Sequence, residues 1–146
     1  MDRVDVSDDG SAGPVLERRL VTQAHDPRAC SEARQVLVEC LKAWQCDHID
    51  DVALVFSEMV TNAVLHAGGA QRISACPADD NHHVHLEVQD NLVATPQRCV
   101  GGPGGGFGLH IIDQLSDRWG TTPTADGKVV WALVPSQCGP AVRPAT

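Results

Sequence analysis

Residues 54–66 read LVFSEMVTNAVLH, a run that is apolar on nearly every side of a helix and is broken by one polar stripe. Residues three and four apart lie on the same helical face. The stripe consists of Ser57, Glu58, Thr61, Asn62 and His66. A helix this apolar is expected to be buried. Burying polar groups costs free energy unless partners meet them, so the pattern predicts either a ligand-binding cavity or an internally hydrogen-bonded stripe.

A glycine-rich segment follows forty residues later. Residues 101–108 read GGPGGGFG and run directly into residues 109–115, whose apolar spacing is helical. Glycines let backbone N–H groups approach an anion closely, and a helix N-terminus adds unpaired N–H groups and a positive dipole end. The segment is therefore a candidate phosphate-binding loop, with a flexible loop as the alternative. It lacks the Gly-Lys-Ser/Thr of a Walker loop and the preceding strand of a dinucleotide fingerprint.

The segment His83 to Asp90 alternates like a half-buried strand and ends in a carboxylate. An acid at a strand end commonly caps a turn. In a nucleotide pocket the same acid could accept a hydrogen bond from an exocyclic amine such as that of adenine. Both roles remain open for Asp90 at this point.

Taken in order, these boxes resemble those of the histidine-kinase-like ATPase superfamily. The boxes are Glu58-x-x-x-Asn62-Ala63, Asp90 and Gly106-x-Gly108-Leu109. More narrowly, the chain resembles the small bacterial anti-sigma-factor serine kinases. The segments 115–120 (LSDRWG) and 127–132 (GKVVWA) strengthen this narrower resemblance, which covers roughly residues 15 to 135.

The resemblance implies roles for individual residues. Asn62 would coordinate Mg²⁺ through its side-chain oxygen, a hard ligand of the kind that Mg²⁺ prefers. Glu58, one turn earlier, would be the catalytic base that orients or deprotonates the attacking hydroxyl, and Asp90 would bind the adenine amine. Residues 92–105 would form a mobile lid. The implied ATP-binding residues are Asn62, Asp90, Gly104, Gly106, Phe107, Gly108 and Leu109.

Two positions depart from the family pattern. The family's adenine box usually continues Asp-x-Gly, whereas Leu92 stands two residues after Asp90. A threonine usually supports adenine from the late strand, whereas this chain has Val129, whose side chain neither donates nor accepts a hydrogen bond. Both changes weaken the expected adenine site, while the Glu58–Asn62 pair and the glycine pair are kept.

Two functions therefore remain open. The first is an anti-sigma-factor-type regulator that binds Mg-ATP and a sigma factor, and that phosphorylates a serine of an anti-sigma-factor antagonist protein. The resemblance implies a homodimer for this function. The second is a catalytically inactive partner-switching module of the same fold, with weak or no nucleotide binding.

Length, charge and hydropathy argue against several other classes of function. The chain has 146 residues, which suits one domain, and a formal net charge of −8. This charge argues against direct binding to nucleic acid or to an anionic membrane. The sequence contains no apolar run long enough to span a bilayer and opens with no signal-peptide pattern, so a cytoplasmic location is expected.

The helices and strands can be placed from local signals. Asp26 and Pro27 form an N-cap and first position, and predict a helix to about Trp44. Asp47 is predicted to cap a second helix that ends at Gly68. A third helix follows the glycine segment to about residue 115. Strands are predicted at residues 15–21, 72–76, 83–89, 119–122 and 128–134.

Residues 15–135 are thus expected to form one α+β domain. Its predicted architecture is a two-layer sandwich with helices packed on one face of a mixed, mostly antiparallel sheet, as in the histidine-kinase-like ATPase fold. Residues 1–14 carry little apolar content and are predicted to be a disordered N-terminal tail. Residues 136–146 are predicted to be a flexible C-terminal tail.

Six cysteines and a histidine cluster suggest further chemistry. The cysteines form no Cys-x-x-Cys pair, and a disulfide framework is not expected, although redox sensing stays open. Cys76 with His82, His83 and His85 is the one cluster with metal-ligand chemistry, and a polar strand surface is the alternative. His66 is expected at a helix end or at the rim of a pocket.

Overall fold

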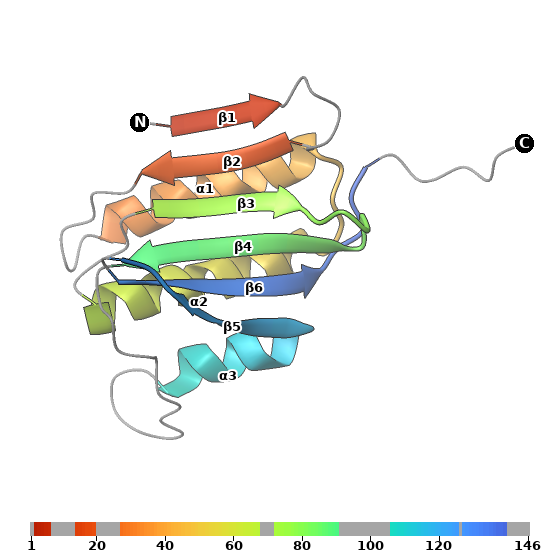
Figure 1. Cartoon of the computed structure of the whole chain (residues 1–146). Coiled ribbons are helices and arrows are strands. Elements are labelled where there is room, and N and C mark those ends of the chain that lie inside the picture. Colours follow the sequence, from red (N-terminus) through yellow and green to blue (C-terminus); the bar gives the residue numbers. More distant parts are fainter. Residues whose placement is uncertain are drawn as a thin grey trace, which may run out of the picture.

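The computed structural model of the chain describes residues 2–6, 14–19, 27–67, 72–90, 106–125 and 127–139. Its strands form one six-stranded sheet in the order β1-β2-β3-β4-β6-β5 (Figure 1). All of the recorded strand pairings are antiparallel, so the mixed sheet that we expected is antiparallel within the described residues. The strands are β1 (Asp2–Val6), β2 (Pro14–Arg19), β3 (Arg72–Pro77), β4 (His83–Asp90), β5 (Arg118–Pro123) and β6 (Lys128–Pro135).

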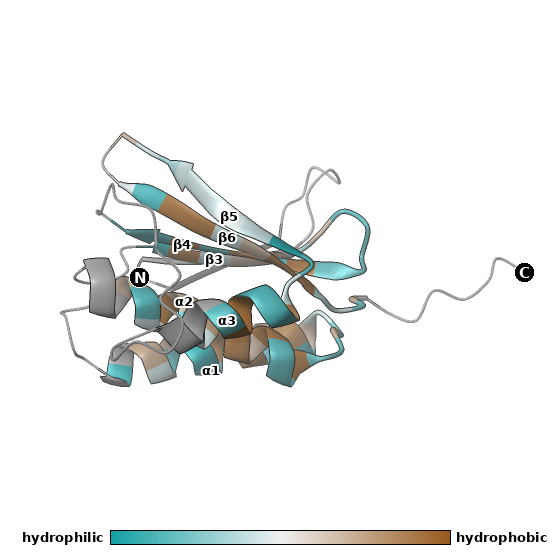
Figure 2. Cartoon of the chain, turned by 90° about the horizontal axis from the view of Figure 1, so that it is seen from below, coloured by the Kyte–Doolittle hydropathy of each residue, from teal (hydrophilic) through white to brown (hydrophobic). Residues whose placement is uncertain are grey.

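The helices cover one face of this sheet, as Figure 2 shows from below. They are α1 (Pro27–Ala43), α2 (Ile49–Ala67) and α3 (Gly106–Leu115). Helix α2 lies between the other two and packs on β4 and β6. The predicted α+β two-layer sandwich is confirmed.

The core lies between the helices and the inner face of the sheet. Strands β4 and β6 alternate between buried and half-buried residues, and their buried residues face the helices. The helices contribute mainly aliphatic side chains around the fully buried Phe56. The principal core residues are Leu37, Leu41, Val52, Val55, Phe56, Met59, Ile73, Leu86, Val88, Ile112, Ala132 and Val134.

The N-terminal tail prediction was wrong for residues 2–6, which form β1 and pair with β2. Backbone groups supply the hydrogen bonds of a strand, so low apolar content did not prevent this pairing. Residues 7–13 lie outside the described part of the chain.

The C-terminal tail prediction was wrong for residues 136–139. Ser136 and Cys138 are buried, and the backbone of this segment bonds to the α1–α2 turn and to the β3–β4 hairpin. Polar composition hid these contacts, because most of them are made by backbone groups. Residues 140–146 lie outside the described part of the chain.

The start of α2 also differs from the prediction. Val52 donates to the carbonyl of His48, which makes His48 the residue before the first turn, and the Asp47 carboxylate accepts from the backbone of Gln137 instead of capping the helix. Asp50 and Asp51 lie in the first turn, where their charges favour the positive helix end. None of the helices in the described ranges is long and apolar enough to cross a membrane.

Candidate functional site

Three elements bring the predicted site residues to one end of the molecule. The C-terminal half of α2, the end of β4 and the beginning of α3 all lie at this end (Figure 1). Helix α2 packs against both β4 and α3. Glu58 and Asn62 are on α2, Asp90 is the last residue of β4, and Gly106 begins α3. The boxes that are far apart in the sequence therefore meet around one end of the sandwich.

The polar stripe of α2 is only partly buried. Ser57, Glu58 and Asn62 are half-buried, whereas Thr61 is exposed. The hydroxyl of Ser57 and the amide nitrogen of Asn62 are buried and have no hydrogen-bond partner among the described residues. The side chain of His66 lies outside those residues. Buried polar atoms are nearly always satisfied in folded proteins, so these two atoms indicate a position where a polar ligand or water would bind.

The carboxylate of Glu58 lies in a partly desolvated environment. This burial raises the pKa of the Glu58 carboxyl above its ordinary value. A carboxylate with a raised pKa is a better proton acceptor near neutral pH. Its position one helical turn before Asn62 places a potential base beside the potential metal ligand.

The glycine segment enters α3 as predicted. Gly106, Phe107, Gly108 and Leu109 form the first turn of this ten-residue helix. The first four N–H groups of a helix have no partner within it and carry its positive dipole end. The first turn can therefore bind an anion through the backbone alone. Gly104 and the predicted lid residues lie outside the described part of the chain.

Asp90 has a partner that the sequence did not reveal. Lys128 Nζ lies 2.9 Å from Asp90 Oδ2 and 3.1 Å from Oδ1, and the two side chains are 6% and 2% exposed. The two residues are directly opposite each other in the β4–β6 pairing. The carboxylate expected to bind adenine is therefore already held by a buried ammonium group.

Buried and half-buried residues alternate along β6, and this alternation decides which of its side chains lie on the same face as Asp90. Lys128 and Val130 are buried on the inner face, whereas Val129 is half-buried on the outer face, away from Asp90. Val129 therefore does not face Asp90, and the side chain beside Asp90 is that of Lys128. The strand period of two would have identified Lys128 once the first residue of β6 was known.

The donor groups can be tested for a fit to Mg²⁺. The amide of Asn62 supplies one hard oxygen, and Mg²⁺ commonly takes its remaining ligands from phosphates and water. The unsatisfied atom of this amide is its nitrogen, a hydrogen-bond donor that a phosphate oxygen beside such a metal ion would satisfy. The histidine cluster fits a metal less well, since His83 contacts the carboxylates of Asp80 and Asp117. The described residues contain no group of three or more His, Cys, Asp or Glu side chains that could hold a metal.

Comparison with known proteins supports the fold and identifies the family. None of the curated proteins compared with the chain is significantly similar to it. A similar solved structure is the crystal structure of the RsbU and RsbW domains of Rv1364c from Mycobacterium tuberculosis. It is 24% identical with a TM-score of 0.60, and the match covers 89% of this chain but only 35% of that chain. Residues 23–133 match the model of the histidine kinase-like ATPase domain, so the chain belongs to the histidine kinase-like ATPase family.

Proposed function

We propose that this domain binds Mg-ATP between α2 and α3 and phosphorylates a serine of an anti-sigma-factor antagonist, so that it controls the availability of a sigma factor. The main support is the unsatisfied amide nitrogen of Asn62, a donor that a phosphate oxygen would satisfy, one turn from Glu58 and on the helix that packs against α3. Membership of the ATPase family is consistent with nucleotide binding. The fold similarity to a structure with an RsbW domain is consistent with the partner-switching role.

In this proposal each residue has a distinct task. Asn62 holds the magnesium ion through its amide oxygen, and the backbone N–H groups of Gly106–Leu109 bind phosphate oxygens. Bound Mg-ATP supplies the transferable phosphoryl group. Glu58 orients the serine hydroxyl and accepts its proton, and Asp90 accepts a hydrogen bond from the adenine amine. Catalysis rests mainly on positioning and charge neutralisation.

Asp90 can perform this task only if it shares its carboxylate. An ionised carboxylate has about four lone-pair sites on its two oxygens. Lys128 contacts both oxygens, so adenine would have to bind a carboxylate that already has a partner. The proposal therefore requires adenine and Lys128 to bind Asp90 together.

The first test is a titration of the full chain with Mg-ATP, ADP and GTP. Binding is measured by calorimetry and by the change in Tm on thermal unfolding. A ligand at a hundred times its dissociation constant stabilises a fold by about 2.7 kcal/mol. We expect adenine nucleotides to bind, and Asn62→Ala to remove binding. Thr61→Ala is the matched control, since Thr61 is the exposed neighbour on the same helix. Equal binding by wild type and Asn62→Ala would contradict the proposed site.

The second test addresses catalysis. Transfer of labelled phosphate from ATP to a candidate antagonist protein is measured for the wild type and for Glu58→Gln. Loss of a general base lowers such rates by about 10²–10⁴-fold. We expect Glu58→Gln to lose transfer and to bind Mg-ATP as the wild type does. Sigma-factor binding and self-association are measured in parallel by analytical ultracentrifugation, in which the proposal expects a homodimer.

The Asp90–Lys128 pair favours a second candidate function, a partner-switching module that binds no nucleotide. Because Lys128 and Asp90 are both buried, the pair could replace the contact that adenine would make. In this case no nucleotide would bind at millimolar concentration, and Glu58→Gln would leave partner binding unchanged.

A further inference from the structure

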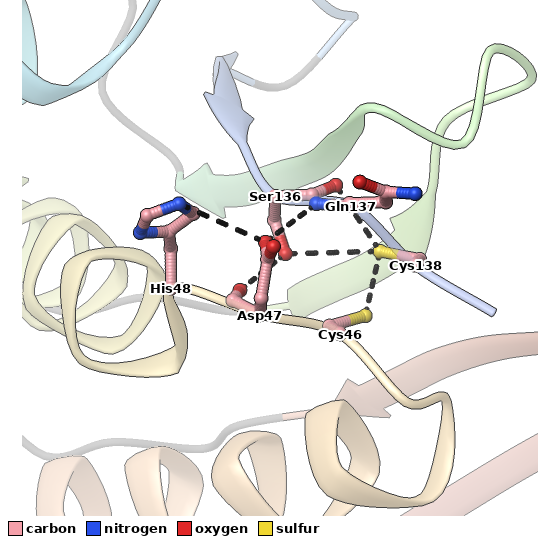
Figure 3. Close-up of polar contacts among 6 residues, drawn as sticks. All are labelled: Cys46, Asp47, His48, Ser136, Gln137 and Cys138. Carbon is pink, nitrogen blue, oxygen red and sulfur yellow. Dashed lines mark hydrogen bonds and ion pairs between the residues drawn. The ribbon is translucent and has the colours of Figure 1, made fainter. Parts of the chain in front are cut away.

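The segment after β6 is fixed against the turn between α1 and α2. Asp47 donates its backbone N–H to the carbonyl of Gln137 at 2.9 Å, and Gln137 donates to the Asp47 carboxylate at 2.7 Å. The Ser136 hydroxyl donates to the carbonyl of Asp47, and Gly139 donates to the carbonyl of Trp44. Figure 3 shows the contacts of Asp47 with Ser136 and Gln137. Together these bonds hold the two backbones in one relative position.

This arrangement brings two thiols together. The Sγ atoms of Cys46 and Cys138 lie 2.6 Å apart, although the residues are 92 positions apart in the sequence. Figure 3 shows the two side chains pointing toward each other from opposite backbones. The sulfur atoms of a disulfide are about 2.05 Å apart. A covalent bond between them therefore requires only a small movement of the side chains.

A cavity beside Cys138 gives a small oxidant access to this thiol. A cavity of about 230 Å³ is lined by Cys138 together with Trp44, Asn81 and Gly139. A water molecule occupies roughly 30 Å³ in the liquid, so molecules of a few heavy atoms fit. Cys46 does not line this cavity. Burial, and then the hydrogen bond with Cys138, raise the pKa of the Cys46 thiol well above its ordinary value, so this thiol stays protonated near neutral pH. Cys138 is thus the residue that an oxidant meets first.

We propose that Cys46 and Cys138 are a redox modification site that peroxide converts to an intramolecular disulfide. The Cys138 sulfur attacks one oxygen of hydrogen peroxide, the O–O bond breaks, and a sulfenic acid forms with release of one water. The Cys46 thiol then loses its proton to the departing hydroxide as its sulfur attacks the sulfenic sulfur. The S–S bond forms, the S–O bond breaks, and a second water leaves. Two thiols are oxidised, and one peroxide is reduced to two waters.

The site is separate from the proposed nucleotide site. Lys128 begins β6 beside Asp90, whereas Cys138 follows the other end of the same strand (Figure 1). A disulfide at this end ties the α1–α2 turn to the segment after β6 and closes a long loop of the chain. Closing such a loop restricts the unfolded chain and stabilises the fold. We expect oxidation to raise Tm on the order of 10 °C and to leave Mg-ATP affinity unchanged.

Peptide mapping tests the link directly, because trypsin isolates each cysteine. Cleavage after Lys42, Arg72 and Lys128 places Cys46 on residues 43–72 and Cys138 on residues 129–146, with no other cysteine on either peptide. The full chain is treated with hydrogen peroxide, alkylated and digested without reductant. We expect a cross-linked pair of these peptides that is lost on adding dithiothreitol, together with the rise in Tm.

Variants and controls make the test decisive. Cys46→Ala and Cys138→Ala should each lose the cross-link and the peroxide-dependent rise in Tm, while Cys76→Ala, a half-buried cysteine of β3, should keep both. Circular dichroism confirms that each variant is folded. Full alkylation of both thiols in folded, peroxide-treated wild type, a stable sulfenic or sulfinic acid on Cys138 without a cross-link, or a link to a different cysteine would each overturn the proposal. None of these readouts depends on nucleotide, so failure of the proposed function would leave them unaffected.

Discussion

Asp90 and Lys128 are directly opposite each other at the ends of β4 and β6, and their side chains form an ion pair on the inner face of the sheet. Both residues are among the few buried polar residues of the described chain. Desolvation offsets much of the attraction in such a pair, yet removing one partner leaves the other charge buried without it. The pair thus links the stability of the fold to the position where adenine is expected.

Replacing one member of this pair should destabilise the protein strongly. We expect Asp90→Leu to lower the free energy of unfolding by about 3–5 kcal/mol, because Lys128 would keep a buried charge. The double variant Asp90→Leu/Lys128→Met should recover most of this loss. Urea unfolding measures all three proteins. The exposed pair of Arg72 and Glu17 is the control, and Arg72→Ala should cost less than about 1 kcal/mol. A double variant as unstable as Asp90→Leu would contradict the expectation.

The same pair sets a prediction for nucleotide affinity. Lys128→Thr removes an ammonium group that competes for Asp90, and the threonine hydroxyl can still donate to the carboxylate. Without this competition the hydrogen bond from adenine to the Asp90 carboxylate should be stronger, and Mg-ATP binding should tighten about tenfold. Calorimetric titration with ATP and GTP measures the change, and GTP is the control because guanine lacks the corresponding amine. Unchanged ATP affinity would show that Lys128 and adenine do not compete.

Glu58 should make stability depend on pH. Its pKa is raised by burial, so the folded state disfavours the charged carboxylate. The resulting destabilisation is absent at pH values below the pKa of this carboxyl in the unfolded chain, about 4.3. It reaches its full size at pH values above the pKa of the carboxyl in the folded protein. Glu58→Gln should therefore raise Tm at pH 7.5 and have little effect at pH 4. Thermal unfolding at both pH values measures this difference. Glu39→Gln on the exposed face of α1 is the control.

His83 should give the opposite pH dependence. Its ring contacts Asp117 and Asp80, and the hydrogen bond to Asp117 is the main cause that raises the pKa of His83. The contacts of protonated His83 stabilise the folded state fully at pH values below the pKa of this ring in the unfolded chain, about 6.5. The stabilisation is lost as pH rises through the pKa of the ring in the folded protein. We expect the Tm advantage of wild type over His83→Gln to be a few degrees at pH 6 and to vanish by pH 9, since exposure limits its size. His110→Gln on α3 is the control, and an advantage that grew with pH would contradict the assignment.

Local patterns predicted most of the fold. The apolar run of residues 54–66 and the alternation of residues 83–90 depend on the chain's own periodicity, and both became the elements expected. The Glu58–Asn62 spacing and the entry of Gly106 into α3 were readable for the same reason. These features can be predicted from neighbouring residues alone, without the contacts between distant segments.

The features that the sequence missed depend on contacts between distant segments. Lys128 meets Asp90 only because of the register between β4 and β6. Cys46 meets Cys138 because the chain after β6 returns to the α1–α2 turn. In the same way Asp47, a plausible helix cap by its local sequence, bonds instead to Gln137, ninety positions later. Tertiary contacts override local capping preferences in such cases.

Gly120 leaves little room for a side chain on the outer face of the sheet. It lies opposite Trp131 in the β5–β6 pairing, and a Cβ atom built on it would be 3.0 Å from Trp131 Cζ2. This is closer than ordinary van der Waals contact, so Gly120→Ala must displace the indole ring or the β5 backbone. Overpacking of this kind costs about 1–3 kcal/mol, which urea unfolding would measure. The double variant Gly120→Ala/Trp131→Leu should be less unstable than the sum of the two single variants, because the smaller side chain relieves the contact. Strict additivity would show that the cost arises elsewhere than at the ring.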